Sequence, residues 1–252
     1  MITISDALIL LCLTLGHIIS IFLLQPELWV EGEETNKFSS KDLWLHSLIA
    51  AAIPFLLLRI IGITSFETLL VIFILHFSIV LIKIFFENKI ENHRILIFIL
   101  EQTLYVAVIL ILFLCLSSNK PLYYFHYFSD SKHLYRYLIV LSSIFFLTKP
   151  AGIIIALLTK KFRDDLETRL GLEKAGTWIG ILERLLIFAF VMTNNLQNIG
   201  FLIAAKSVFR LSEYKENIKF SEYVIIGTLL SFTIAIMIGL FSKHLLFFYA
   251  YF

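Results

Sequence analysis

Seven or eight apolar runs of membrane-spanning length fill most of this chain, and ionisable residues stand inside several of them. A helix needs about 20 predominantly apolar residues to cross the hydrocarbon of a bilayer. The predicted spans are residues 3–24, 43–63, 68–86, 95–116, 136–158, 177–193, 197–211 and 222–242. The seventh of these has only 15 residues, so it is expected to be a full span, a tilted half-span or a re-entrant segment. The chain is therefore predicted to be an all-α transmembrane helical bundle.

Composition excludes an ordinary soluble protein. The 252 residues are 59% hydrophobic, and their mean hydropathy is +0.89. No stretch between spans reaches the roughly 50 residues that an independent soluble domain needs, so residues 1–252 are predicted to form a single integral membrane domain.

The expected partner is the lipid bilayer. The net charge of +2 gives no reason to expect a nucleic acid. The loops at 25–43 and 159–176 are candidate docking sites for a cytoplasmic protein, and the sequence leaves an oligomer open.

The distribution of lysine and arginine predicts the orientation. Thirteen of these residues fall in one set of alternate loops and five in the opposite set. Cytoplasmic loops of membrane proteins carry the excess of basic residues. Both termini are therefore predicted to lie outside the cytoplasm.

Charged residues inside the spans predict a polar interior. A charge near the bilayer centre costs roughly 2.5–3.5 kcal/mol on insertion scales, so these side chains must face away from lipid. The direction of each span places them in one layer, which predicts a cytoplasm-facing pocket of Glu101, Gln102, Glu183, Arg184, Lys206, Arg210, Glu222, Thr228 and Ser231.

Two of these charges, Glu183 and Arg184, are neighbours in the sequence. Adjacent positions of a helix point about 100° apart, so the two cannot satisfy each other. Glu183 is predicted to pair with Lys206. Arg184 is predicted to pair with Glu101.

Histidines supply a second candidate site on the same half of the membrane. His17, His46, His76 and Glu101 come from four different spans and offer the ligand types of zinc or the groups of a proton relay. Their spacing contains no H-x-x-x-H pair and does not demand a metal. No cofactor is expected as first choice, and zinc or another divalent metal belongs to an alternative hypothesis.

Lys149 and Pro150 interrupt the fifth predicted span. Proline cannot donate the helix hydrogen bond, so a kink that exposes a carbonyl is predicted there. With the short seventh span, this kink suggests discontinuous helices, which are typical of channels and transporters.

Several segments resemble a bacterial multi-pass membrane family known only as domain of unknown function 3307. In the C-terminal half the similar stretches are Ala175–Ile187, Ile199–Arg210 and Glu222–Phe232. In the N-terminal half they are His17–Gln25, His76–Lys83 and Glu101–Tyr105, which are similar to H-x-x-x-D-F-x-L-Q, H-x-x-x-D-x-x-K and D-Q-x-x-H. The resemblance implies a membrane fold and a bacterial inner membrane, and it supplies no accepted activity.

Three positions depart from the family pattern. Ile21 and Val80 stand where the pattern has aspartates, and Tyr105 stands where it has a histidine. Residues four apart share a helix face, so such Asp and His pairs would hold a metal or relay a proton. If the family's cluster is a metal-dependent active site, this chain resembles a degenerate member.

Three functions follow from these patterns. The first hypothesis is a non-catalytic module that binds, conducts or gates a small polar species or ion. The first alternative is an intramembrane metal-dependent hydrolase or transferase that acts on a lipid-linked substrate. The second alternative is an assembly or interaction subunit of a membrane complex.

Overall fold

The structure is a computed structural model that describes residues 4–26, 29, 40–63, 65–87, 94–118, 131–164, 175–210 and 218–248. All regular secondary structure within these residues is helical, which confirms the all-α prediction. The chain divides into two compact units, Met1–Ser142 and Ser143–Phe252.

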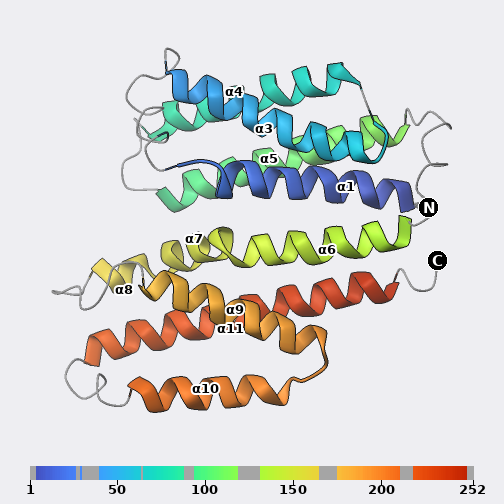
Figure 1. Cartoon of the computed structure of the whole chain (residues 1–252). Helices are drawn as coiled ribbons and strands as arrows, with labels where there is room; N and C mark the ends of the chain where they lie inside the picture. The colour runs from blue at the N-terminus through green and yellow to red at the C-terminus, as the bar shows by residue number, and fades with distance from the viewer. Residues whose placement is uncertain are drawn as a thin grey trace. The chain divides into compact units, whose positions relative to one another are not determined.

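Four membrane-length segments make up most of the first unit (Figure 1). They are α1 (Ile4–His17) with its direct continuation, the π-helix η1 (Ile18–Leu23), α3 (Lys41–Ile60), α4 (Phe66–Glu87) and α5 (Arg94–Ser118). Packing runs in a closed order, because α1 contacts α3 and α5, and α4 contacts the same two helices. The unit is therefore a four-helix bundle, to which the beginning of α6 (Ser131–Leu147) also belongs.

Local sequence sets the ends of α3. The Ser40 hydroxyl accepts a hydrogen bond from the backbone N–H of Leu43 and so caps the first turn. At the other end Gly62 adopts a φ of 91°, which glycine tolerates without strain. The N–H groups of Gly62 and Ile63 then bond back to the last turn in the Schellman arrangement. The helix stops there because its final carbonyls are satisfied.

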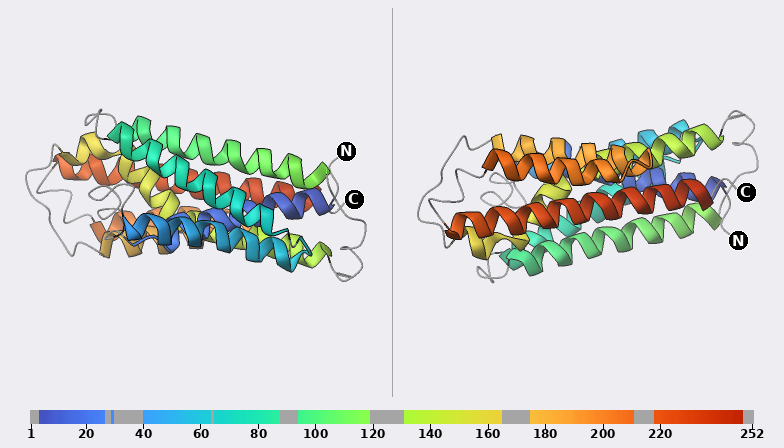
Figure 2. Two further views of the ribbon diagram at one scale, coloured as in Figure 1. Left: turned by 90° about the horizontal axis from the view of Figure 1, so that it is seen from above. Right: turned by 90° about the horizontal axis from the view of Figure 1, so that it is seen from below.

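The second unit is built around α9 and α11 (Figures 1 and 2). Its helices after the end of α6 are α7 (Lys149–Leu158), α8 (Lys160–Asp164), α9 (Ala175–Met192), α10 (Gln197–Arg210) and α11 (Ile218–Phe248). Helix α11 packs against α9 and α7, and α10 packs against α9. Asn194 adopts a φ of 63° and ends α9, which lets the chain turn into α10.

Seven of the described helical segments are long and apolar enough to cross a membrane. The doubtful seventh span is not among them, because α10 has 14 residues and a length of about 21 Å. The fifth span is confirmed as two helices, α6 and α7, that meet at Thr148. Helix α11 has 31 residues and extends past both ends of the predicted 222–242.

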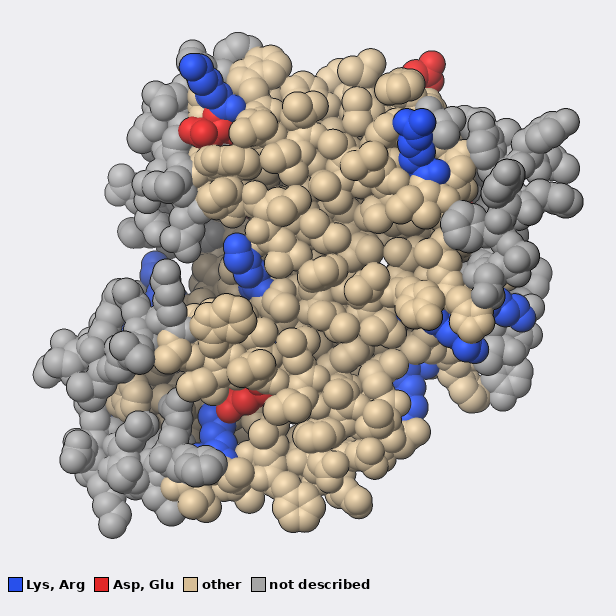
Figure 3. Space-filling view, in the orientation of Figure 1, with Lys and Arg blue, Asp and Glu red and all other residues tan. Residues whose placement is uncertain are grey.

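Uncharged residues dominate the surface of the described part of the chain. On the face drawn in Figure 3 most of its atoms belong to uncharged side chains, and charged side chains stand singly or in pairs. Exposed large hydrophobic residues are found on α3, α4, α5, α9, α10 and α11. A surface of this kind matches the hydrocarbon of a bilayer.

Candidate functional site

A run of imidazole and phenol rings crosses the interior of the first unit. The rings of His46 on α3 and His76 on α4 meet edge to face with centroids 4.8 Å apart. The Tyr105 hydroxyl on α5 lies 3.3 Å from Nε2 of His76. The Tyr105 ring in turn lies 4.8 Å from the ring of His17 at the end of α1. Four helices thus contribute to one continuous polar run.

Polar side chains make hydrogen-bond contacts with the three histidine rings. Nε2 of Gln25 lies 3.1 Å from Nδ1 of His46, and the Ser47 hydroxyl lies 3.4 Å from Nδ1 of His76. The Gln102 side chain hydrogen-bonds to His17. Both His46 and His76 are buried, with exposed fractions of 2% and 5%.

The π-helix η1 shapes the α1 side of this site. Its backbone bonds span five residues, as in the bond of 3.0 Å from the Leu24 N–H to the Ile19 carbonyl. The buried Ser20 hydroxyl donates to the carbonyls of Gly16 and His17 at 2.8 and 3.2 Å. Short π segments inside α-helices occur frequently at functional sites.

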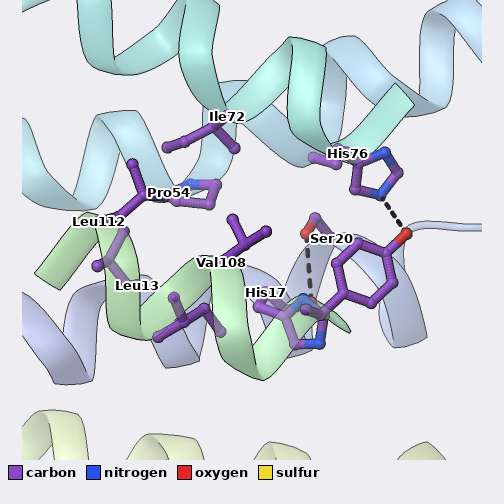
Figure 4. Close-up of a pocket in the computed structure, with 11 residues that line it drawn as sticks. Leu13, His17, Ser20, Pro54, Ile72, His76, Val108 and Leu112 are labelled. Carbon is purple, nitrogen blue, oxygen red and sulfur yellow. Dashed lines mark hydrogen bonds between the residues drawn. The ribbon is translucent and has the colours of Figure 1, made fainter. Parts of the chain in front are cut away.

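A cavity of about 30 Å³ lies beside the ring run. Figure 4 shows His17, Ser20 and His76 near one end of it, with Leu13 and Ile72 among the apolar residues farther along. A space of this size holds a water molecule when polar groups line it. Pro54 in α3 cannot donate a helix bond to the carbonyl of Ala50, and both residues line the cavity.

Glu101 contributes to the first unit as one half of an ion pair. Its carboxylate lies 3.8 Å from Nζ of Lys83, and both side chains are largely shielded. The predicted pair of Glu101 with Arg184 would join the two units, and neither unit's geometry includes it. Each of these charges has partners within its own unit. The polar residues are therefore described unit by unit, and the single pocket stays a prediction.

In the second unit the predicted pair of Glu183 and Lys206 is confirmed. Nζ of Lys206 on α10 lies 2.6 Å from the Glu183 carboxylate on α9. The same ammonium lies 5.6 Å from the centroid of the Phe232 ring on α11. This pair joins the short helix α10 to the rest of the unit.

Replacing Glu183 by glutamine is expected to lower the free energy of unfolding by about 2 kcal/mol, because the ammonium of Lys206 loses its carboxylate in a largely shielded place. Reversible chemical unfolding in detergent measures the change. Glu222→Gln is the matched control, since that carboxylate is exposed on α11, and it is expected to stay within about 0.5 kcal/mol. Equal effects of the two variants would contradict a stabilising pair.

Arg184 binds backbone carbonyls at the break between α6 and α7. Its Nε donates to the Leu147 carbonyl at 2.6 Å, and one terminal nitrogen donates to the Thr148 carbonyl at 3.0 Å. The other terminal nitrogen donates to the Ser231 hydroxyl at 3.4 Å. The guanidinium thus binds two backbone carbonyls just before Lys149 and Pro150, where the sequence predicts a kink.

Glycines leave room for this guanidinium. A Cβ atom on Gly180 would lie 3.1 Å from one terminal nitrogen of Arg184, and a Cβ on Gly152 would lie 3.7 Å from the other. The group is buried, with an exposed fraction of 4%. A cation placed at the last carbonyls of α6 also interacts favourably with the helix dipole.

The remaining predicted pocket residues lie on α10 and α11. Thr228 is half-buried and Glu222 is exposed on α11, while the side chain of Arg210 lies outside the described residues. The predicted docking loops lie mostly outside them too, since 27–28, 30–39 and 165–174 are not described.

The metal hypothesis fits the described residues poorly. No three His, Cys, Asp or Glu side chains in this part of the chain are placed to hold a metal ion. The predicted set of His17, His46, His76 and Glu101 therefore does not converge on one point. Zinc sites need three or four ligands around a common centre.

Sequence reasoning missed several members of the two groups. Tyr105, Gln25 and Ser47 contact the histidines, yet each is a residue type that occurs often in helix interiors and at helix ends without a function. Tyr105 did carry a signal, because it stands where the family pattern has a histidine, four residues from Glu101 on the same helix face. The carbonyls of Leu147 and Thr148 carry no signature in the side-chain sequence at all.

The seven apolar helices and their buried polar groups define a multi-pass helical membrane protein. A family model described as "Protein of unknown function (DUF3307)" matches residues 9–146, more than half of the chain. The chain belongs to this family. No curated protein and no solved structure matches it.

The match covers the first unit from α1 to α6 and leaves the similar C-terminal stretches outside its range. Ile21, Val80 and Tyr105, which depart from the family pattern, therefore lie within the matched residues. Ile21 and Tyr105 pack together with Ile79 in one apolar cluster. Val80 packs with Leu43 and Ile84 in another. Ile21 and Val80 are thus part of the apolar packing of the first unit.

Proposed function

We propose that this chain is a protein of the bacterial inner membrane, with both termini outside, whose first unit binds a small polar species or ion from the cytoplasmic side without catalysis. The observation that carries the proposal is the ring run of His46, His76, Tyr105 and His17 beside a water-sized cavity. Buried ionisable groups inside membrane spans mark functional sites by default.

The arrangement favours binding over conduction. The ring run extends from the middle of the bundle toward the end where α3 begins, because His76 and Tyr105 lie near the middle of α4 and α5 while His46 falls early in α3. Apolar side chains of the cavity, such as Leu13 and Leu112, lie next along α1 and α5. Asp6 and Ser117 hydrogen-bond to each other beyond them. Within the described residues, apolar side chains thus separate the ring run from the polar pair at the other end of the bundle.

The cavity size favours a small occupant. A volume of about 30 Å³ accommodates an occupant of about the size of water. A lipid-linked substrate would need a far larger opening beside the histidines, since pockets for drug-sized ligands hold about 300–1,000 Å³. The size of the cavity supports the binding of a small species over the hydrolase or transferase hypothesis.

Cysteine labelling from each side of oriented vesicles tests the proposal. In a chain whose Cys12 and Cys115 are replaced by alanine, Ser20→Cys is expected to react with a small charged thiol reagent from the cytoplasmic side only, because Ser20 lines the cavity. Thr14→Cys on the same helix is the control and is expected to stay unmodified. Reaction of the Ser20 variant from the outside, or from neither side, would contradict one-sided access.

A further inference from the structure

We propose that the species bound by the first unit is a neutral water molecule, held in the cavity beside the ring run, and that this site excludes ions. This inference rests on the proposed function and names its ligand. The cavity has about the volume that one water molecule needs, and polar side chains lie near one end of it (Figure 4). The charges, hydrogen-bond acceptors and hydrogen-bond donors of the lining decide between a neutral ligand and an ion.

The lining of the cavity offers an ion no opposite charge. No carboxylate, ammonium or guanidinium group is found among the described residues that line it. Two charged residues of the same unit, Lys83 and Glu101, lie 3.8 Å from each other instead. A buried ion needs an opposite charge or a full shell of ligands to offset its lost hydration. A neutral ligand needs neither, so it fits this cavity better.

Hydrogen-bond acceptors come from two of the segments that line the cavity. The Ser20 hydroxyl of η1 directs its hydrogen to the carbonyls of Gly16 and His17, at 2.8 and 3.2 Å, so its oxygen presents lone pairs to other donors. On α3, Pro54 has no N–H group, and the carbonyl of Ala50 lacks the donor that an α-helix supplies four residues on. An anion has no hydrogen to share with these oxygens, so they disfavour it.

Hydrogen-bond donors are available in the same lining. A neutral imidazole carries one donor and one acceptor nitrogen, and both His17 and His76 line the cavity. The Tyr105 hydroxyl, which also lines it, lies 3.3 Å from Nε2 of His76. In the tautomer with the hydrogen on Nε2, the phenol oxygen accepts that hydrogen and the phenol keeps its own for a ligand. A cation accepts no hydrogen bond, so such donors disfavour it.

Water matches this mixed lining because it both donates and accepts hydrogen bonds. Buried waters in proteins typically make about three hydrogen bonds to polar groups. The candidate partners come from three segments of the first unit, with Ser20 on η1, Ala50 on α3 and Tyr105 on α5. The bound water therefore serves as a bridge between segments of the bundle, and an ion finds no matching set of ligands there.

Solid-state NMR of the full chain in lipid bilayers, with ¹³C-labelled serine and tyrosine, tests the proposal. The experiment measures the transfer of magnetisation from water protons to nearby carbon atoms. Ser20 and Tyr105 are expected to receive it several-fold faster than Ser143, a buried serine of the second unit whose hydroxyl lies 2.7 Å from that of Ser242. Transfer to Ser20 as slow as transfer to Ser143 would overturn the proposal.

A matched pair of variants on α5 locates the water. Val108→Ile adds one methyl group to the wall of the cavity and is expected to slow the transfer to Ser20 and Tyr105 to the rate seen at Ser143. Val106→Ile makes the same change at an exposed position and is expected to leave the transfer unchanged. Unchanged transfer in a folded Val108→Ile variant would overturn the site. The comparison of Ser20 with Ser143 in the unaltered chain decides the matter if Val108→Ile does not fold.

Titration with sodium chloride and with ammonium chloride tests the exclusion of ions. The Ser20 and Tyr105 signals are expected to stay unchanged in both salts, and a saturable shift in either salt would overturn a neutral site. Ser20→Cys labelling separates this inference from the proposed function. Cytoplasmic labelling without water transfer at Ser20 in the unaltered chain rejects the water and keeps the proposed function, whereas water transfer without labelling supports the water and rejects the cytoplasmic access.

Discussion

Replacing Arg184 by methionine is expected to lower the free energy of unfolding by about 4 kcal/mol, because two buried carbonyls lose charged donors. Methionine fills a similar volume and donates nothing to Leu147 or Thr148. The Leu147 carbonyl then loses its charged donor within a membrane span, where no water replaces it, while the Thr148 carbonyl keeps only the Gly152 N–H at 3.4 Å.

Reversible unfolding in detergent measures this loss, and two variants calibrate it. Arg184→Lys keeps the charge, but its single ammonium lacks the fork that reaches both carbonyls, so an intermediate loss is expected. Lys149→Met removes an exposed cation from the same segment and is expected to change stability by less than about 0.5 kcal/mol. An Arg184→Met variant as stable as Lys149→Met would show that the guanidinium does not hold the break.

Replacing Gly16 by alanine is expected to cost about 3 kcal/mol, because the added methyl group has no space. A Cβ atom at this position would lie 2.6 Å from the backbone Cα of Pro54 and within 2.8 Å of its ring atoms. A rigid proline on α3 cannot turn away, so α1 and α3 must separate. The separation would also displace Ser20 and His17, which lie on the same turns as Gly16.

Thermal unfolding of Gly16→Ala and Gly227→Ala side by side checks this expectation. Gly227 lies in α11, and nothing lies within 4 Å of a Cβ built there. Alanine at 227 is expected to be neutral or to stabilise by up to about 1 kcal/mol through helix propensity. Similar melting temperatures for the two variants would mean that α1 and α3 do not meet closely at Gly16.

Helix positions could be predicted from the sequence because apolar runs of membrane length have one stable solution, the helix. The prediction of 177–193 lies within two residues of α9, which Asn194 ends. The prediction for α11 stopped too early at 242, because Lys243 and His244 lower the hydropathy while the helix continues through them. Hydropathy predicts which part of a helix lies in the hydrocarbon, but the helix itself ends where its backbone hydrogen bonds end.

The two polar groups were predictable to different degrees. Glu183 and Lys206 lie on consecutive helices joined by a short turn, so their meeting follows from chain connectivity. The partners of Arg184 are main-chain carbonyls, which every residue carries, and only the kink at Pro150 hinted at them. Tyr105 was read as a lost histidine, whereas the fold uses its hydroxyl beside His76.

The pairing of Glu183 with Lys206 has a consequence for how the second unit is made. Glu183 is synthesised 23 residues before Lys206, so α9 leaves the ribosome before the ion-pair partner of this carboxylate has been made. Hydrocarbon penalises such a charge until its partner arrives. Helices α9 and α10 are therefore expected to enter the bilayer together, as a hairpin in which Lys206 pairs with Glu183.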